Sequence, residues 1–447
     1  MTEKRAVFAT RFAAVATTVG SAVGLGNIWR FPYEAGMHGG AAFILCYLAF
    51  VFAIALPVLC AEFAMGRDTR SNIFGAFRKL CPGGAWHYVG YVAILASLLI
   101  LSFYSVVAGW TVEYTLASVC GKLNFADAAT GHGQFVELTT GWRPVVWTVI
   151  FLLCNVCVLM GGVTKGIERM SNILMPLLFV LLVAFCINSF TMPGFADGIR
   201  FLFSPDFSKI TPAVLLSALG QAFFSLSLGL GCMMTYASYF SDRNRLGTTA
   251  FTTAMLDTLV AILAGIIIFP AVFSFGISPG SGPTLVFEVL PFIFSQLPAG
   301  AVWSTLFFML LFLASITSTV SMSEISITFL CEEKKMSRRS ATLLSSAIAL
   351  VGGVLCALSF GPLRGFTIGG MTVFDLFDYV SSNICLPLGG MAVSIFVGWV
   401  IDRRMLRRQM TDGGAFRFRL LPVLVFCLRW LCPAAILLIF LNSIGLI

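Results

Sequence analysis

Charged residues are scarce in this sequence. Asp, Glu, Lys and Arg make up only 11% of its 447 residues, whereas 58% are hydrophobic. A soluble domain typically carries about 25% charged residues, because its surface must face water. Since so few charges cannot cover a water-facing surface, most of this surface must face lipid. We therefore predict an all-α polytopic membrane protein.

Histidine is also rare, and phosphate-binding loops are missing. The three histidines, His38, His87 and His132, lie in loops or near the ends of apolar runs and have no metal-ligand spacing. No Walker-type phosphate loop occurs in the sequence. These absences argue against an intramembrane enzyme and against transport driven directly by ATP.

Cysteine is present but forms no framework. Nearly all of the thirteen cysteines lie inside apolar runs. Cys154 and Cys157 have CxxC spacing, but they lie within a span and no second pair accompanies them. We expect the cysteines to act as small hydrophobic side chains, with no disulfide and no metal site.

Eleven apolar windows are long enough, at about 20 residues or more, to cross a membrane. The first follows Arg11, lacks a processing site and continues into Trp29-Arg30-Phe31-Pro32, so we expect a working span rather than a cleavable signal. The windows lie near 11–36, 40–65, 87–119, 144–163, 170–190, 212–240, 248–276, 301–331, 340–360, 372–401 and 420–445.

Lysine and arginine gather on alternate connections between these windows. Twenty-one lie in 4–11, 67–79, 165–169, 243–245, 334–339 and 403–419, against five in the other connections. Because cytoplasmic loops carry the excess of Lys and Arg, we predict a cytoplasmic N-terminus and, with an odd number of spans, an external C-terminus. The protein should lie in the inner (cytoplasmic) membrane of the cell. The net charge of +8 reflects this topology and requires no nucleic-acid partner.

Three long connections, 120–143, 191–211 and 277–300, are predicted to be external. The last contains Pro291-Phe292-Ile293-Phe294, an apolar stretch too short to span the membrane. The stretch is equally compatible with a helical cap over a vestibule and with a packed loop.

Two Gly-Leu-Gly steps, at 24–26 and 229–231, interrupt the first and sixth windows. Glycine costs roughly 1 kcal/mol of helix stability relative to alanine, so two glycines in one turn favour unwinding. One such step alone would more often indicate close helix packing. Here each step opens a run of five spans, and five is odd, so the two runs have opposite orientations in the membrane.

An inverted repeat with broken helices at matching places indicates a transporter binding site. The N–H groups at the start of a half-helix attract a carboxylate, and the carbonyl groups at the end of a half-helix attract cations. Such a site suits a zwitterion together with Na⁺.

The first break resembles the first-span signature of the neurotransmitter:sodium symporters, in the string Gly20-Ser21-Ala22-Val23-Gly24-Leu25-Gly26-Asn27-Ile28-Trp29-Arg30-Phe31-Pro32-Tyr33. The likeness continues at 39–43, 62–67, 225–229, 235–239 and 314–318 and covers essentially the whole chain. It implies a LeuT-like 5+5 inverted repeat with discontinuous first and sixth helices, plus an eleventh span, as in the short bacterial branch. The repeats would occupy 1–190 and 212–404, joined by an external loop at 191–211 and followed by a cytoplasmic loop and the eleventh helix at 405–447.

The resemblance also implies a function. We expect secondary active symport, in which inward movement of Na⁺ drives uptake of a neutral, hydrophobic or aromatic L-amino acid by alternating access. Sodium would be the coupling ion at two sites, and no obligate protein partner is expected. The alternative is a transporter-like receptor that binds an amino acid without moving it.

Two sodium sites follow from the resemblance. The second site would use Gly20, Val23, Ala314, Thr317 and Ser318. The first site would use Ala22, Asn27 and Ser225, with a ligand from the seventh span. Relatives usually have an amide at that seventh-span position, and this sequence has Asp257. Asp257 either binds Na⁺ directly or supplies the charge that other members obtain from chloride, and we favour independence from chloride.

The substrate site is expected between the two breaks. The carboxylate would meet Tyr104 and the N–H groups near Gly24 to Gly26, and the side-chain pocket would be mostly apolar, with Leu230 leaving room for an aromatic ring. The expected substrate residues are Ala22, Gly24, Leu25, Gly26, Ile100, Tyr104, Phe224, Ser225, Ser227, Leu230, Ser321 and Met322.

Two gates are implied as well. Arg30 and Asp378 resemble the external pair, with Gln221 and Phe224 beside them. Arg5 and Glu332 resemble the cytoplasmic pair, with Phe8 and Tyr239 beside them. Exposed ion pairs contribute only ~0–1 kcal/mol, which suits contacts that must break in every cycle.

Overall fold

Helices dominate the fold, as lipid requires. A computed structural model of the chain describes residues 5–123, 125, 128–276, 285–415 and 417–446. In these ranges no strand forms, and the only β pairing is an isolated bridge between Ile368 and Met371. Because a helix satisfies its own backbone hydrogen bonds, it is the form that an apolar chain adopts where water is absent.

Within the described ranges, nine helical segments are long and apolar enough to cross a membrane. They are Ala41–Thr69, Ala85–Val119, Arg143–Met160, Val163–Ser189, Leu246–Ser274, Gly300–Glu333, Arg338–Leu358, Val373–Val400 and Leu421–Ser443. A tenth span is the pair Arg11–Ala22 and Gly26–Met37, bent by 55° at its break. The sixth predicted window, 212–240, forms two shorter helices, Pro212–Ser225 and Cys232–Ala237. Each of the eleven windows therefore contains helix.

The first repeat and its flanking segments contain α1 to α10, with short 3₁₀ or π-type turns labelled η. Their bounds are α1 (Arg11–Ala22), η1 (Gly26–Arg30), α2 (Phe31–Met37), α3 (Ala41–Phe50), η2 (Val51–Ala55), α4 (Leu56–Thr69), α5 (Ile73–Leu80), η3 (Ala85–His87), α6 (Tyr88–Val119), α7 (Ala128–Thr139), α8 (Arg143–Met160), η4 (Val163–Glu168), α9 (Arg169–Ser189), α10 (Phe195–Phe203) and η5 (Phe207–Lys209).

The rest of the chain contains α11 to α21. The bounds are α11 (Pro212–Ser225), α12 (Cys232–Ala237), α13 (Leu246–Ser274), η6 (Leu285–Val289), α14 (Leu290–Ser295), α15 (Gly300–Glu333), α16 (Arg338–Leu358), α17 (Val373–Asp378), η7 (Tyr379–Cys385), α18 (Leu386–Ile395), η8 (Phe396–Val400), α19 (Arg403–Met410), η9 (Asp412–Gly414), α20 (Leu421–Phe426), η10 (Cys427–Leu431) and α21 (Cys432–Ser443).

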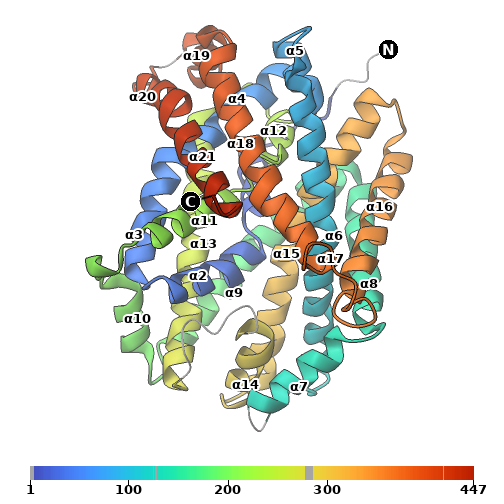
Figure 1. The fold of residues 1–447 in the computed structure, drawn as a ribbon, viewed down its shortest axis with the longest axis vertical. Helices are drawn as coiled ribbons and strands as arrows, with labels where there is room; N and C mark the ends of the chain where they lie inside the picture. Colours follow the sequence, from blue (N-terminus) through green and yellow to red (C-terminus); the bar gives the residue numbers. More distant parts are fainter. Residues whose placement is uncertain (1–4, 124, 126–127, 277–284, 416, 447) are drawn as a thin grey trace.

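The two ends of the bundle differ in what they carry. In Figure 1 the basic helices α5 and α19 lie at the top, whereas α7 and α14 lie at the bottom and α10 in the lower half. Two of the basic segments that were expected on one side of the membrane, those in α5 and α19, therefore lie at the same end of the molecule.

Three predicted external loops are partly helical. The segment 191–211 contains α10 and η5 rather than loop alone, and 120–143 contains α7. Pro291–Phe294 lies in α14, where Phe294 packs on the rings of Phe185 and Phe307. Residues 277–284 of the third loop lie outside the described ranges. These helices are too short to be recognised by periodicity, and tertiary packing stabilises them.

The second break is built on positive φ angles. Gly229 and Gly231 have φ of 83° and 78°, a region that side chains other than glycine's rarely enter. The backbone of Gly229 lies directly against α18, so that a Cβ there would overlap the carbonyl oxygen of Leu386 and lie 2.7 Å from the Gly390 nitrogen. The break is therefore fixed by a backbone-to-backbone contact with the tenth span.

We predict that Gly229→Ala destabilises the protein more than Gly220→Ala. A left-handed backbone costs a residue other than glycine roughly 1–2 kcal/mol, and the new Cβ would also meet α18. Gly220 lies in α11, where a Cβ meets nothing within 4 Å, so this matched variant should be neutral or slightly stabilising. Thermal unfolding of the purified proteins measures the difference, and equal unfolding temperatures would contradict the assigned backbone geometry.

Candidate functional site

A central cavity lies where the two breaks meet. It has about 390 Å³ of empty volume. Its walls are lined by Ala22, Gly24, Gly26, Asn27, Ile100, Tyr104, Phe224, Ser225, Ser227, Leu230, Ser318, Met322 and Leu386. Most of the polar side chains meet at the first break: Asn27 and Ser318 contact Gly24 and Val23, Tyr104 contacts Leu25, and Ser225 contacts Asn27. The larger apolar side chains come from α6, α11, α15, α18 and the second break. The cavity thus has a polar end and an apolar end.

Asn27 organises the polar end. Its Oδ1 accepts a hydrogen bond from the Gly24 nitrogen at 3.1 Å, which satisfies one backbone group freed by the break. Its Nδ2 donates to Ser225 Oγ at 3.0 Å and to Asp257 Oδ1 at 2.7 Å. One amide therefore joins the first break, the end of α11 and the seventh span.

Asp257 is a fully buried carboxylate on α13. Ser225 Oγ donates to its Oδ2 at 2.6 Å, and Asn27 donates to its other oxygen. Among the described residues no lysine or arginine pairs with it. Because a carboxylate is costly inside a membrane, one that lacks a protein counter-charge points to a functional role.

The residues expected at the second sodium site also come together. Ser318 Oγ on α15 donates to the Val23 carbonyl at 2.9 Å, and Thr317 Oγ1 donates to the Ala314 carbonyl at 3.0 Å. A Cβ on Gly20 would lie 3.4 Å from the Thr317 Cβ, so α1 and α15 are in close contact here. The cluster offers neutral oxygen atoms, the kind of ligand that a hard cation prefers.

The glycines of the first break leave room for two aromatic rings. A Cβ on Gly24 would lie 2.8 Å from the Tyr104 hydroxyl, and a Cβ on Gly26 would lie 2.8 Å from the Phe224 ring. The Leu25 nitrogen donates to the Tyr104 hydroxyl at 2.8 Å. Glycine is needed at these two positions because a side chain would not fit, and not because the backbone has a positive φ.

Ten of the twelve expected substrate residues line the cavity, and two do not. Leu25 contributes its backbone to Tyr104, and Ser321 Oγ is turned to the Ser318 carbonyl at 2.6 Å. Leu386 lines the cavity although the sequence reasoning did not select it. No pattern in a single sequence points to Leu386, because its place beside Gly229 is decided by how the tenth span packs on the second break.

Glu62 was also missed as a structural residue of the site. It is fully buried in α4, and its Oε1 accepts a hydrogen bond from the Gly229 nitrogen at 2.8 Å. The carboxylate thus caps a backbone group at the second break, as Asn27 does at the first. A buried acid in the middle of an apolar window is the signal that could have pointed to this role.

The outer cavity lies beyond Phe224 and has about 1090 Å³ of empty volume. Arg30 lines it and pairs with Glu34, one turn further along, at 3.6 Å. The guanidinium also lies 4.5 Å from the centre of the Phe224 ring. Gln221 donates to the Gly26 carbonyl at 3.2 Å.

The expected Arg30–Asp378 pair is not formed in this structure. Asp378 instead accepts a hydrogen bond from Ser382 at 2.8 Å. The acid that lies four residues after Arg30 on the same stretch of helix is the nearer partner, a spacing that favours pairing. No ion pair between Arg30 and Asp378 therefore closes the outer cavity that Arg30 and Phe224 line.

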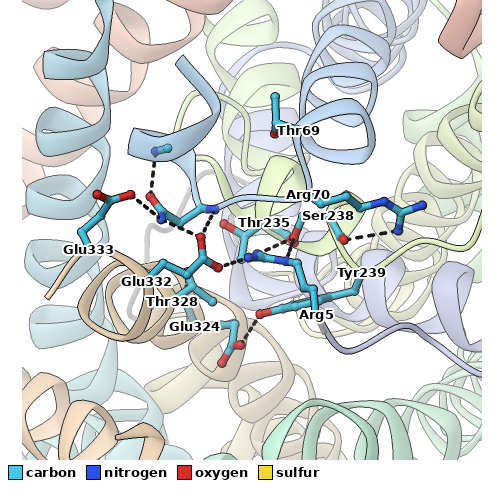
Figure 2. Close-up of polar contacts among 12 residues, drawn as sticks. Arg5, Thr69, Arg70, Thr235, Ser238, Tyr239, Glu324, Thr328, Glu332 and Glu333 are labelled. Atoms are coloured by element: carbon cyan, nitrogen blue, oxygen red, sulfur yellow. Dashed lines mark hydrogen bonds and ion pairs between the residues drawn. The ribbon is translucent and has the colours of Figure 1, made fainter. Parts of the chain in front are cut away.

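The inner gate residues form one closed network (Figure 2). Arg5 pairs with Glu332 and donates to Ser238 Oγ from Nη2 at 2.6 Å. Its guanidinium also lies over the Tyr239 ring, and the Phe8 nitrogen donates to the Tyr239 carbonyl at 2.9 Å. Burial lowers the pKa of the Arg5 guanidinium, and the nearby Tyr239 opposes this effect.

A second acid extends this network. The Tyr239 hydroxyl donates to Glu324 Oε1 at 2.7 Å, and both oxygens of Glu324 accept from Arg338. Glu332 in turn accepts hydrogen bonds from the backbone and side-chain nitrogens of Asn72 at 2.9 and 2.8 Å. The network thus joins the N-terminal segment to α5, α12 and α15.

Comparison with known proteins now identifies the family. The family model described as "Sodium:neurotransmitter symporter family" matches residues 5–138 and 134–446. The chain belongs to the sodium:neurotransmitter symporter family.

Relatives of this symporter extend over its whole length. It is 36% identical to a sodium-dependent transporter, YhdH, of Bacillus subtilis, with 100% of both chains covered. It is 26% identical to the sodium- and chloride-dependent GABA transporter 2 of Rattus norvegicus, over 99% of this chain and 80% of that protein.

A solved structure of similar fold is that of MhsT in complex with L-phenylalanine. The TM-score is 0.91 at 42% identity, over 98% of the symporter and 100% of MhsT. The symporter therefore has the LeuT-like inverted-repeat fold, and it is a sodium-coupled transporter of the membrane.

We predict that Glu332→Gln exposes the inner pathway of the symporter. The pair with Arg5 is partly buried, and such a pair contributes on the order of 1 kcal/mol. Its loss should therefore raise the population of molecules with an open inner side about fivefold. Cys232 is buried and directly follows the second break. It should then react faster with a thiol reagent, as followed by mass spectrometry of its peptide.

The matched control is Glu333→Gln. Glu333 neighbours Glu332 in sequence but pairs with Arg78 at 2.8 Å. Its replacement should leave the reaction rate of Cys232 unchanged. An equal rate in the two variants would show that the Arg5–Glu332 pair does not hold the inner side closed.

Proposed function

We propose that this chain takes up a neutral, hydrophobic or aromatic L-amino acid together with Na⁺. The observation that carries the proposal is the two-ended cavity at the breaks. Its polar end contains Asn27, Tyr104 and the backbone groups of the first break, and its apolar end contains no charged side chain among the described residues. An ionised substrate side chain would lack a partner there, and burying it would be costly.

The zwitterion has a natural orientation in this cavity. Its carboxylate lies toward Tyr104 and the backbone nitrogens of the first break, where a half-helix begins. Its ammonium group lies toward the carbonyl oxygens near Ala22 and toward Ser227, whose hydroxyl already contacts the Ser21 carbonyl at 3.3 Å. The L-phenylalanine bound to MhsT supports an aromatic side chain at the apolar end.

Sodium binds at two sites in this proposal. At the first, Ala22, Asn27, Ser225 and Asp257 act with the substrate carboxylate. The Asn27 oxygen is used by Gly24 here, so an ion would take the place of that hydrogen bond. At the second, Gly20, Val23, Ala314, Thr317 and Ser318 supply oxygen atoms. Because the substrate completes the first site, ion binding and substrate binding support each other.

Alternating access then uses the two gates in turn. The closed inner network and the open outer cavity support an outward-facing state for this structure. Arg30 exchanges Glu34 for Asp378 when the outer side closes, and the Arg5–Glu332 pair opens when the inner side is exposed. Inward movement of one cation gains about 2.3 kcal/mol per 100 mV, which drives uptake.

The proposed membrane orientation follows the basic residues. The N-terminus lies in the cytoplasm and the C-terminus outside, in the inner membrane of the cell. Asn442 and Ser443, near the end of α21, line the same outer cavity as Arg30, in agreement with an external C-terminus.

Uptake by purified protein in proteoliposomes tests the function. An inward sodium gradient should drive accumulation of a labelled neutral amino acid, and potassium should not. Thr317→Ala combined with Ser318→Ala should raise the sodium concentration needed for half-maximal uptake at least several-fold, because two oxygen ligands are lost.

The matched control is Ser304→Ala, which removes a buried hydroxyl from the same helix, α15, far from the break in sequence. Its sodium activation should be that of the wild type. Sodium-dependent binding without accumulation would instead support a receptor, and no binding of any neutral amino acid would overturn the proposal.

We also predict that wild-type uptake is the same in chloride and in gluconate, and that Asp257→Asn makes it depend on chloride. The carboxylate supplies a negative charge beside the first sodium site, and an amide of equal shape does not. An anion from solution must then supply it. A chloride requirement in the wild type would refute the idea that Asp257 replaces a bound anion.

A further inference from the structure

Two side chains separate the outer cavity from the central cavity. Among the described residues, only Phe224 and Leu386 line both. Phe224 comes from the end of α11 and Leu386 from the start of α18. Any molecule that passes from the outer side to the breaks must move past these two residues.

Phe224 belongs to the first break. Its ring lies in the space that the missing side chain of Gly26 leaves free, and Arg30 covers one face of the ring. A change in the first break or in the outer ion pair would therefore move this ring.

Leu386 belongs to the second break. Its carbonyl oxygen lies against the Cα of Gly229, and a Cβ on Gly389 would overlap the Gly229 carbonyl in return. The residue is 5% exposed. It follows the π-type turn η7 directly, and such turns are frequent at functional sites because they shift which face a helix presents.

Leu386 and Leu230 both line the central cavity. Leu230 follows Gly229 in the chain, and Gly229 is the residue that touches Leu386 through the backbone. This backbone contact fixes, relative to each other, the two chain positions that carry the leucine side chains. A change of volume at one position should be felt at the other.

We propose that Leu386 determines, together with Leu230, the largest substrate side chain that the cavity accepts. The proposal rests on the proposed function and adds a specificity residue from the tenth span to the same site. An apolar pocket discriminates substrates by volume, and one methylene group changes the preference by roughly 10–200-fold. Leu386 also lies between the central cavity and the outer cavity. Its size therefore affects both the entry of a substrate and the fit of the substrate side chain.

The test uses purified full-length protein and sodium-dependent binding of labelled alanine, leucine, phenylalanine and tryptophan. Leu386→Phe should weaken the binding of phenylalanine and tryptophan at least roughly tenfold, while alanine changes by less than about threefold. Leu386→Ala should shift the preference the opposite way, toward tryptophan over leucine. Leu386→Met, which conserves volume, should keep the wild-type order.

A double variant separates a specificity role from a structural one. Leu230→Phe alone should reject the larger amino acids, and adding Leu386→Ala should restore them, because the lost volume reappears beside the new ring. A merely destabilised protein would bind every amino acid more weakly and would not show this rescue.

Leu216→Ala is the matched control, since Leu216 lines the outer cavity but not the central one. Its order of preference should be unchanged. If the wild type binds no neutral amino acid, the proposed function fails. If the wild type binds them but the size order is the same in the Phe, Ala and double variants, only the role of Leu386 is overturned.

Discussion

Breaking a helix inside a membrane frees backbone N–H and carbonyl groups that water cannot reach, and each must find a partner within the protein. The rest of this structure depends on that constraint. At the first break the partners are Asn27, Tyr104 and Ser318, and at the second Glu62 meets the Gly229 nitrogen. These partners come from α4, α6, α15 and the break itself, so packing of the whole bundle is needed to hold two unwound segments open.

The same partners are the groups that a substrate and sodium would use. A residue that satisfies an unwound backbone group can exchange that bond for a bond to a ligand at small net cost, because the number of contacts is conserved. Asn27 illustrates this, since one amide reaches Gly24, Ser225 and Asp257. The groups that satisfy the unwound backbone therefore also form the site, and each break has a fully buried carboxylate nearby: Asp257 beside Asn27 at the first and Glu62 at the second.

The ion pairs of the two gates contribute less to stability than the packed helices do, and in this structure the inner pair is formed while the outer pair is not. The inner side is held by several contacts on Arg5, whereas Arg30 on the outer side remains with a neighbour on its own helix. Ion pairs near water contribute little to stability, so a network of them can form and separate without changing the fold. The long helix α15 packs against both α1 and α12, one half of each broken span, and against α6.

Much of this could be predicted from the sequence, because hydrophobic length and glycine pairs are local signals. All eleven windows, the two breaks and the placement of the basic helices α5 and α19 at one end follow from composition and order along the chain. The resemblance of the string at 20–33 to a known family then predicted the fold. The partner of Arg30, the capping role of Glu62, the short helices α7, α10 and α14 and the place of Leu386 could not be predicted in this way. The last three depend on groups distant in sequence that only the packed bundle brings within contact distance, whereas for Arg30 only the packed structure decides that it pairs with Glu34 rather than Asp378.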